Sequence, residues 1–185
     1  SSAGDVKNRP GGRVLETETR EGFMAAITTP ERTADSDQIV AFEGVAWSGY
    51  ISVLKLRGAR SLPRVVYLDG RLTLLSASYA HERLKKLLGS FVEIVFEGLG
   101  FRFVAGGSTS LRLKRERGGV EGDETYFLKN LDGLRGKKRI DLRVAAPPDL
   151  AVEVVVTHEA DDAVEGYRRL GVPGVWICTQ TGGVF

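Results

Sequence analysis

The most regular pattern of hydrophobic and polar positions lies between residues 78 and 99 and predicts a long helix. Apolar residues recur there at intervals of three and four, which is typical of a helix with one face toward a core. Ser78 precedes the pattern and is a suitable N-cap. The predicted core-facing stripe comprises Leu84, Leu87, Leu88, Phe91, Val92, Val95, Phe96 and Leu99.

Shorter patterns predict further helices and strands around this helix. Helical spacing followed by a glycine predicts helices over residues 42–58 and 159–171. The dipeptide Asp69-Gly70 between two apolar runs predicts a β-hairpin. Strands are predicted within "FRFVAGGSTSLRLKRE", "GDETYFLKN", "LAVEVVV" and "VPGVWICTQ", and "TGG" near the end is typical of a turn. This order predicts an α/β fold in which helices flank a mixed central sheet.

Composition limits the alternatives. The chain has 185 residues, 42% hydrophobic and 27% charged, which favours one domain with a core over residues 38–185. Residues 1–37 are polar and weakly periodic, so we expect a disordered or loosely attached tail. No apolar run approaches the ~20 residues of a membrane span, and a cytoplasmic location is expected. A single cysteine, Cys178, excludes a disulfide within one chain and a cysteine-based zinc site.

Three carboxylates are the candidate chemical groups. Glu153 interrupts an apolar run, where its charge would require a metal ion, a lysine or a retained proton. Asp123 begins a predicted strand, and Glu82 lies in the first turn of the long helix. Together they would suit Mg²⁺ or Mn²⁺. The alternative is a structural role, with Glu82 favouring the helix dipole and Glu153 paired with an arginine.

Four segments together resemble a known family. They are "YLDGRLTLLSASYAHERLKKLLGSFVE", "GGSTSLRLKRERGGVEGDETYFLKN", "IDLRVAAPPDLAVEVVVT" and "YRRLGVPGVW", and they are similar to the Uma-type endonucleases of the PD-(D/E)xK nuclease superfamily. The resemblance implies a restriction-endonuclease-like core that hydrolyses DNA phosphodiester bonds with Mg²⁺ or Mn²⁺. It places the superfamily's metal ligands on Asp123 and Glu153, and its auxiliary catalytic carboxylate on Glu82.

The sequence departs from the family pattern at two positions. The proline before the first aspartate is replaced by Gly122. The catalytic lysine is absent both from its usual position, Val155, and from the alternative position on the following helix, Ala163. That lysine would polarise the attacking water and stabilise developing charge. His158 is the nearest residue able to accept a proton, although a solvated loop histidine is the simpler interpretation. A catalytically impaired, nuclease-fold module that binds nucleic acid is therefore the alternative function.

The remaining candidates concern partners. Net charge is only +2, so DNA would be bound by local basic clusters. Two clusters flank the strand that begins with Asp123, and contact with the DNA backbone is predicted for both. His81 falls on the apolar stripe of the long helix, and a satisfied core histidine is favoured over a metal ligand. A homodimer is a further expectation, since relatives that cut both strands often act as dimers. The predicted nucleic-acid-binding residues are Arg112, Lys114, Arg115, Lys137, Lys138 and Arg139.

Overall fold

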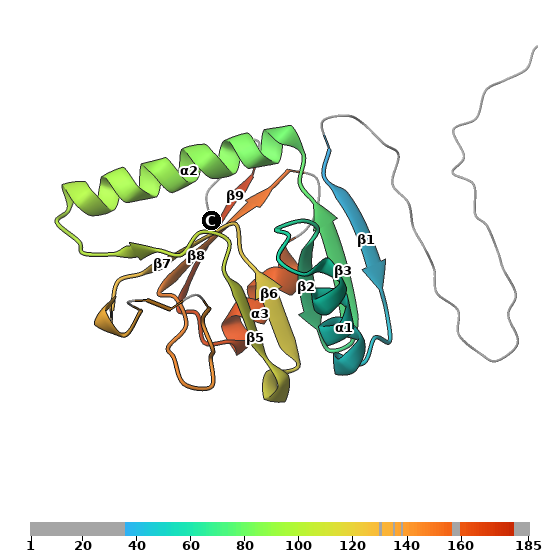
Figure 1. Ribbon diagram of the computed structural model, residues 1–185. Helices are drawn as coiled ribbons and strands as arrows, with labels where there is room; N and C mark the ends of the chain where they lie inside the picture. Colours follow the sequence, from blue (N-terminus) through green and yellow to red (C-terminus); the bar gives the residue numbers. More distant parts are fainter. Residues whose placement is uncertain (1–35, 130, 135, 138, 157–159, 180–185) are drawn as a thin grey trace, which may run out of the picture.

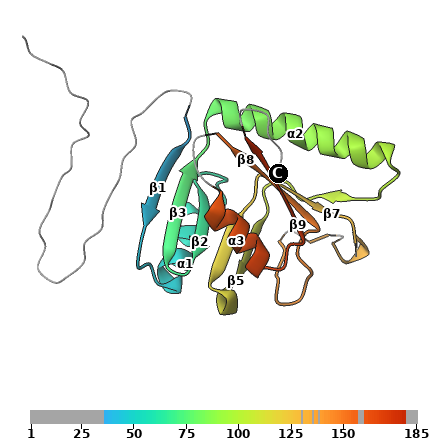
Figure 2. The same ribbon diagram turned by 180° about the vertical axis from the view of Figure 1, so that it is seen from behind.

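The fold is α/β, with two β-sheets and three α-helices in the part of the chain that the computed structural model describes (Figures 1 and 2). That part comprises residues 36–129, 131–134, 136–137, 139–156 and 160–179. The predictions for residues 1–35, Lys138, His158 and the turn at 181–183 lie outside it.

The first sheet is antiparallel and has five strands. Its hairpin turns at Asp69 and Gly70, which have φ angles of 49° and 102°. Positive φ at both central residues suits a tight hairpin, which confirms the predicted turn. Helix α1 (Trp47–Arg57) packs on this sheet through Tyr50. The strand order is β1 (Gln38–Phe42), β3 (Arg71–Ser76), β2 (Arg64–Leu68), β6 (Gly118–Glu121) and β5 (Ser110–Leu113).

The second sheet is mixed and has four strands. Helix α2 (Tyr79–Gly98) covers one of its faces, where Val92 and Phe96 pack against Tyr126 and Val152. Helix α3 (Asp161–Arg169) connects the parallel strands β8 and β9 and packs where the two sheets meet. The strand order is β4 (Val104–Ala105), β7 (Glu124–Phe127), β8 (Leu150–Val155) and β9 (Gly174–Thr179).

The chain passes from one sheet to the other at residues 122 and 123. Strand β6 ends at Glu121 in the first sheet, and β7 begins at Glu124 in the second. At this crossing the Gly122 N–H donates to the Thr109 carbonyl oxygen at 3.4 Å. Such a bend lets one continuous segment serve both sheets. Asp123 is therefore placed at the junction of the sheets.

Two strands were not predicted from the sequence. Strand β1 occupies the boundary between the predicted tail and the first predicted helix, so that helix begins at Trp47 instead of residue 42. Strand β6 contains Gly118 and Gly119, which are unfavourable in strands. A side chain at Gly119 would overlap the ring and hydroxyl of Tyr50, so packing against α1 requires glycine there.

The apolar stripe predicted on the long helix is only partly buried. The N-cap is confirmed, because the Ser78 hydroxyl accepts a hydrogen bond from the His81 N–H. Val92 and Phe96 are buried, but Leu87 and Phe91 are 58% and 57% exposed. The apolar side chains extend farther around α2 than the part of the helix that contacts the second sheet. None of the described helices is long and apolar enough to cross a membrane.

Close packing of α3 on β6 generates a stability prediction. A Cβ atom at Gly166 would collide with Val120, whereas one at Gly98, the last residue of α2, would meet open space. We expect Gly166→Ala to lower the free energy of unfolding by about 1–3 kcal/mol. Gly98→Ala should leave it unchanged or raise it by up to ~1 kcal/mol. Urea unfolding of both variants measures this difference, and equal effects would contradict the packing described.

Candidate active site

The structure brings the predicted carboxylates Asp123 and Glu153 together. Strands β7 and β8 are antiparallel with Glu124 opposite Val152, which places Asp123 beside Glu153 where the two sheets join. Asp123 is fully buried and Glu153 is 8% exposed. The Val154 N–H donates to Asp123 Oδ2 at 2.8 Å, so the carboxylate of Asp123 is held against the backbone of β8. We call these two residues the carboxylate pair.

The carboxylate pair has one ionised member and one protonated member at neutral pH. Burial would raise the pKa of Asp123, but the hydrogen bond from His81 and the charge of Arg64 outweigh burial and lower it. Burial and the negative charge of Asp123 raise the pKa of Glu153 to about 8. Two adjacent buried carboxyl groups rarely ionise together. Glu153 thus retains its proton and places no charge in the apolar strand, which is one of the options that the sequence left open.

Arg64 is the cation of the site, and the sequence did not indicate it. It begins β2, is 5% exposed and forms an ion pair with Asp123. Its Nη2 also lies 3.3 Å from Glu82 Oε1. The side chain of Glu82 is 44% exposed, and in the described contacts it joins the carboxylate pair only through Arg64. Glu82 therefore lies at the rim of the site, near the pair but without a described direct contact.

His81 links the carboxylate pair to the start of the described chain. Its Nε2 lies 2.9 Å from Asp123 Oδ1 and its Nδ1 2.9 Å from Asp37 Oδ2. Burial lowers the pKa of His81, but the hydrogen bonds to Asp123 and Asp37 outweigh it and raise the pKa to about 9. His81 is the buried, satisfied histidine that the sequence favoured, but its partners belong to the site.

Asp37 also fixes the first turn of α2. Its Oδ1 accepts a hydrogen bond from the Ser78 N–H at 2.7 Å, while Arg64 Nη2 approaches His81 Nε2 to 2.7 Å. His81 Nε2 and the Arg64 guanidinium thus converge on the carboxylate of Asp123. Asp37 contacts the other ring nitrogen, Nδ1, and so holds the ring from its opposite side. The sequence placed Asp37 in the tail because a single polar residue before β1 carries no periodic signal.

Tyr167 and Gly122 together define the surroundings of Glu153. The buried Tyr167 hydroxyl donates a hydrogen bond to Glu153 Oε1. A Cβ atom at Gly122 would collide with that hydroxyl and lie 3.6 Å from Glu153 Oε1. The proline of the family pattern has a Cβ atom and lacks the N–H that Gly122 donates. The absence of a side chain at position 122 therefore leaves room for the hydrogen bond from Tyr167 to Glu153.

Ala163 lies one helical turn before Tyr167, on the same face of α3. It is partly buried and packs against the apolar cluster that contains Val120, Ala151 and Tyr167. The position that the resemblance assigns to a lysine is therefore an apolar contact in this chain.

A second buried glutamate, Glu121, differs in its surroundings from Glu153. Glu121 Oε1 accepts hydrogen bonds at 2.6 Å from both Arg57 and Ser110, and the Val65 N–H donates to Oε2 at 3.0 Å. These donors satisfy the charge by protein groups alone. Glu121 thus forms a structural ion pair with Arg57, whereas Glu153 has a tyrosine donor and a negatively charged neighbour.

Binding of a magnesium or manganese ion at the carboxylate pair stays a prediction. Among the described residues, no group of three or more His, Cys, Asp and Glu side chains could hold a metal. Mg²⁺, however, commonly takes only one or two protein carboxylates and completes its octahedron with water and substrate phosphates. Glu153 holds a proton that a cation at the pair would displace. Asp123 and Glu153 would supply two such carboxylates, whereas Glu82 contacts Arg64.

One predicted basic cluster lies away from the carboxylate pair. Lys114 and Arg115 are exposed in the 3-10 turn η1 (Lys114–Glu116), which joins β5 to β6 at the end opposite the Asp123 junction. From Gly118 to Asp123 the chain rises ~16 Å at 3.3 Å per residue. The cluster flanks Asp123 in sequence, but it is about one strand length away in space. This corrects the expectation that it lies close to the pair.

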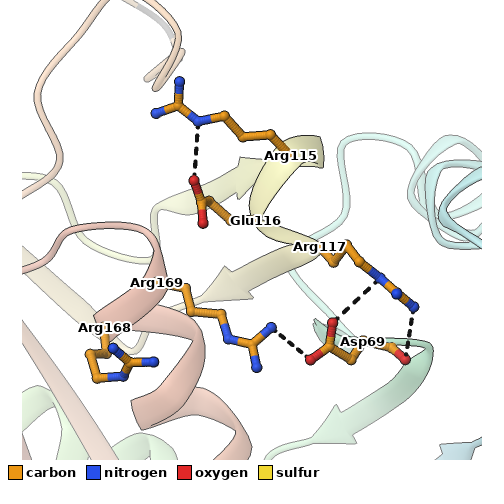
Figure 3. Close-up of a pocket in the computed structure, with 6 residues that line it drawn as sticks. All are labelled: Asp69, Arg115, Glu116, Arg117, Arg168 and Arg169. Atoms are coloured by element: carbon orange, nitrogen blue, oxygen red, sulfur yellow. Dashed lines mark hydrogen bonds and ion pairs between the residues drawn. The ribbon is translucent and has the colours of Figure 1, made fainter.

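The arginines near η1 are already paired with carboxylates. They line an open hollow with Asp69 and Glu116 (Figure 3). Arg115 contacts Glu116 at 3.1 Å, and Arg169 contacts Asp69 at 2.6 Å. Arg112 is exposed on β5, and Lys137 and Arg139 of the other cluster are exposed in the segment before β8. Contact of these residues with DNA stays a prediction. The lining residues are Asp69, Arg115, Glu116, Arg117, Arg168 and Arg169.

Comparison with known families identifies the family to which the chain is similar. Residues 52–184 match the profile of the Uma2 family, whose description is "Putative restriction endonuclease". The matched range contains Arg64, Glu82, Asp123 and Glu153, whereas Asp37 precedes it. No curated protein sequence matches the chain.

The raised pKa of Glu153 generates a prediction about stability and pH. The folded pKa of about 8 exceeds the unfolded value of 4.5. The folded state therefore binds the proton more tightly, and this stabilising contribution is complete below pH 4.5 and lost as pH rises through 8. Glu153→Gln cannot lose a proton. We expect the free energy of unfolding of the natural protein to fall by several kcal/mol relative to Glu153→Gln between pH 5 and 8, measured by urea unfolding with EDTA. A constant difference across this range would contradict the protonated pair.

Proposed function

Because the chain belongs to the Uma2 family, we propose that it is a metal-dependent endonuclease that hydrolyses DNA phosphodiester bonds at the carboxylate pair. The family match supports a nuclease-like function. The observation that supports this particular site is the buried contact of Asp123 with a protonated Glu153. Strongly perturbed carboxyl groups are a recurrent property of catalytic sites.

Asp123 and Glu153 would hold the Mg²⁺ or Mn²⁺ ion. Bound there, the cation would supply an activated water and stabilise charge on a phosphate oxygen. The chain's own residues prepare these ligands. His81 and Arg64 keep Asp123 ionised, and Tyr167 fixes the orientation of Glu153 through its hydroxyl. The low dielectric of this buried site strengthens each of these interactions.

Arg64 is the residue best placed to supply the positive charge of the absent lysine. It contacts Asp123 directly and is held by Glu82 at the rim. A preorganised cation beside a reacting phosphate stabilises the negative charge that develops in the transition state. Lys85 is a second cation near the rim. Its Nζ lies 3.0 Å from the Ser108 hydroxyl, which donates to the Asp123 carbonyl oxygen at 3.2 Å, so Lys85 reaches the pair less directly.

A binding module without catalysis is the second candidate, and two observations favour it. Ala163 contributes to the apolar core, and the ion pair with Arg64 already offsets the charge of Asp123. In that case the fold would bind nucleic acid through its basic residues alone. The two functions differ in whether the carboxylate pair matters for any measured activity.

Cleavage of supercoiled plasmid distinguishes these candidates. We expect the natural protein to nick the plasmid with Mg²⁺ or Mn²⁺, and Glu153→Ala to be inactive because it removes one of the two proposed ligands. Glu43→Ala is the matched control, since that side chain is 69% exposed and pairs with Arg71. Nicking that survives in Glu153→Ala would show that the pair is not the site. DNA binding without nicking by the natural protein would favour the binding module.

The role of Arg64 is tested by removing its charge and placing a positive charge at position 163 instead. We expect Arg64→Met to lower the single-turnover cleavage rate by about 10²-fold or more. Adding Ala163→Lys to Arg64→Met should recover at least a tenfold part of this loss, because position 163 lies on the face of α3 that carries Tyr167. Arg60→Met, an exposed arginine, is the control.

These variants test the role of Arg64 separately from the endonuclease function. Cleavage by the natural protein that is unchanged in Arg64→Met would exclude the proposed role of Arg64 and leave the endonuclease proposal intact. Activity that appears only when Ala163→Lys is introduced into the natural protein would identify a scaffold that lacks a usable cation. Circular dichroism of each variant determines whether its fold is retained, since loss of Arg64 leaves the buried charge of Asp123 poorly matched.

A further inference from the structure

Helix α2 has a second apolar stripe, on the side away from the sheet. Leu87, Phe91 and Ile94 are 58%, 57% and 67% exposed. They are spaced by four and three residues and therefore share one side of the helix. Figures 1 and 2 show α2 lying along the outside of the molecule, with the sheet on one side only. We call these three residues the outer stripe.

The charged residues beside the outer stripe are separated by sign along the helix. Arg83 and Lys86 lie in the N-terminal half of α2, and Glu93 and Glu97 lie in the C-terminal half. At 100° per residue these four side chains fall within about 80° of one another around the helix axis, next to the outer stripe. One flank of the stripe is therefore positive at one end and negative at the other.

This arrangement is complementary to itself when a second helix runs in the opposite direction. In an antiparallel pair related by a twofold axis near Ser90, Arg83 of one copy meets Glu97 of the other, seven residues on either side of the axis. Lys86 meets Glu93, and Leu87 approaches Ile94. In a parallel pair related by a twofold axis, the charged flanks of the two copies would lie on opposite sides of the contact and would not meet.

Exposed apolar residues at the two ends of α2 fit the same arrangement. Tyr79 at the N-terminus is 80% exposed, and Phe101 just beyond the C-terminus is 53% exposed. Antiparallel pairing brings the start of one helix to the end of the other, so these aromatic side chains would meet. Trp176, which is 36% exposed, pairs in register with Val152 and thus lies on the sheet face that α2 covers. It extends the apolar surface beside the helix.

We propose that the outer stripe is the interface at which a second copy of this chain docks, with the two α2 helices antiparallel. The apolar residues would form the centre of the contact and the opposite charges its edge, as is usual in protein interfaces. This dimer does not depend on catalysis. It would remain even if the carboxylate pair proved inactive.

Sedimentation velocity of the full chain over a range of concentrations tests the dimer. We expect a concentration-dependent dimer, and we expect Phe91→Glu to raise its Kd by roughly 30-fold or more, as for loss of an interface hot spot. Leu56→Glu is the matched control, since Leu56 is an 83% exposed leucine on α1 and lies outside the proposed contact. Monomers at every concentration, or a dimer that Phe91→Glu does not weaken, would overturn the proposal.

A charge exchange tests the antiparallel orientation. Arg83→Glu and Glu97→Arg should each raise the Kd by roughly tenfold, because each creates a like-charge contact across the twofold axis. The double variant restores both opposite-charge contacts and should return the Kd to within a few-fold of the natural value. A double variant that is weaker than either single variant would exclude the antiparallel dimer. The nicking assay is not needed for any of these outcomes.

Discussion

The burial of Asp123 is the constraint on which the rest of the structure depends. A carboxylate with no exposed surface is tolerated only when donors replace its water, and these come from three different elements. His81 is on α2, Arg64 on β2, and the Val154 N–H on β8. The contacts that keep Asp123 ionised therefore also fix the long helix and both sheets at one point. Removing a single donor would leave a buried charge poorly matched, which typically costs several kcal/mol.

The second carboxyl group of the pair follows from the first. Because Asp123 already carries the negative charge, Glu153 retains a proton, and its pKa is raised to about 8. Glu121 shows that the same fold can satisfy a buried glutamate fully with Arg57 and Ser110. Glu153 has no such cation in contact with it among the described interactions. This contrast is the reason why we propose Glu153, and not Glu121, as a ligand for a cation from outside the chain.

Local signals predicted much of the fold, and long-range pairing explains what they missed. The Asp69-Gly70 hairpin, the Ser78 cap and the apolar strand around Glu153 depend on adjacent residues and were identifiable from the sequence. Arg64 and Asp37 were not, because only strand pairing and helix docking bring them to Asp123 and His81. Strand β6 was missed because Gly119 is required by Tyr50, a contact that no local pattern reveals. The stripe on α2 was predicted to face one core, whereas its outer part faces away from the sheet.

The central claim is that the carboxylate pair binds a divalent cation in place of the proton on Glu153. Titration calorimetry with Mn²⁺ at pH 7, repeated in buffers of different ionisation enthalpy, measures binding and proton release together. Since the pKa of Glu153 is about 8, we expect about one proton to be released per bound ion. Glu153→Gln should neither bind tightly nor release a proton. Absence of binding by the natural protein, or binding without proton release, would contradict the claim.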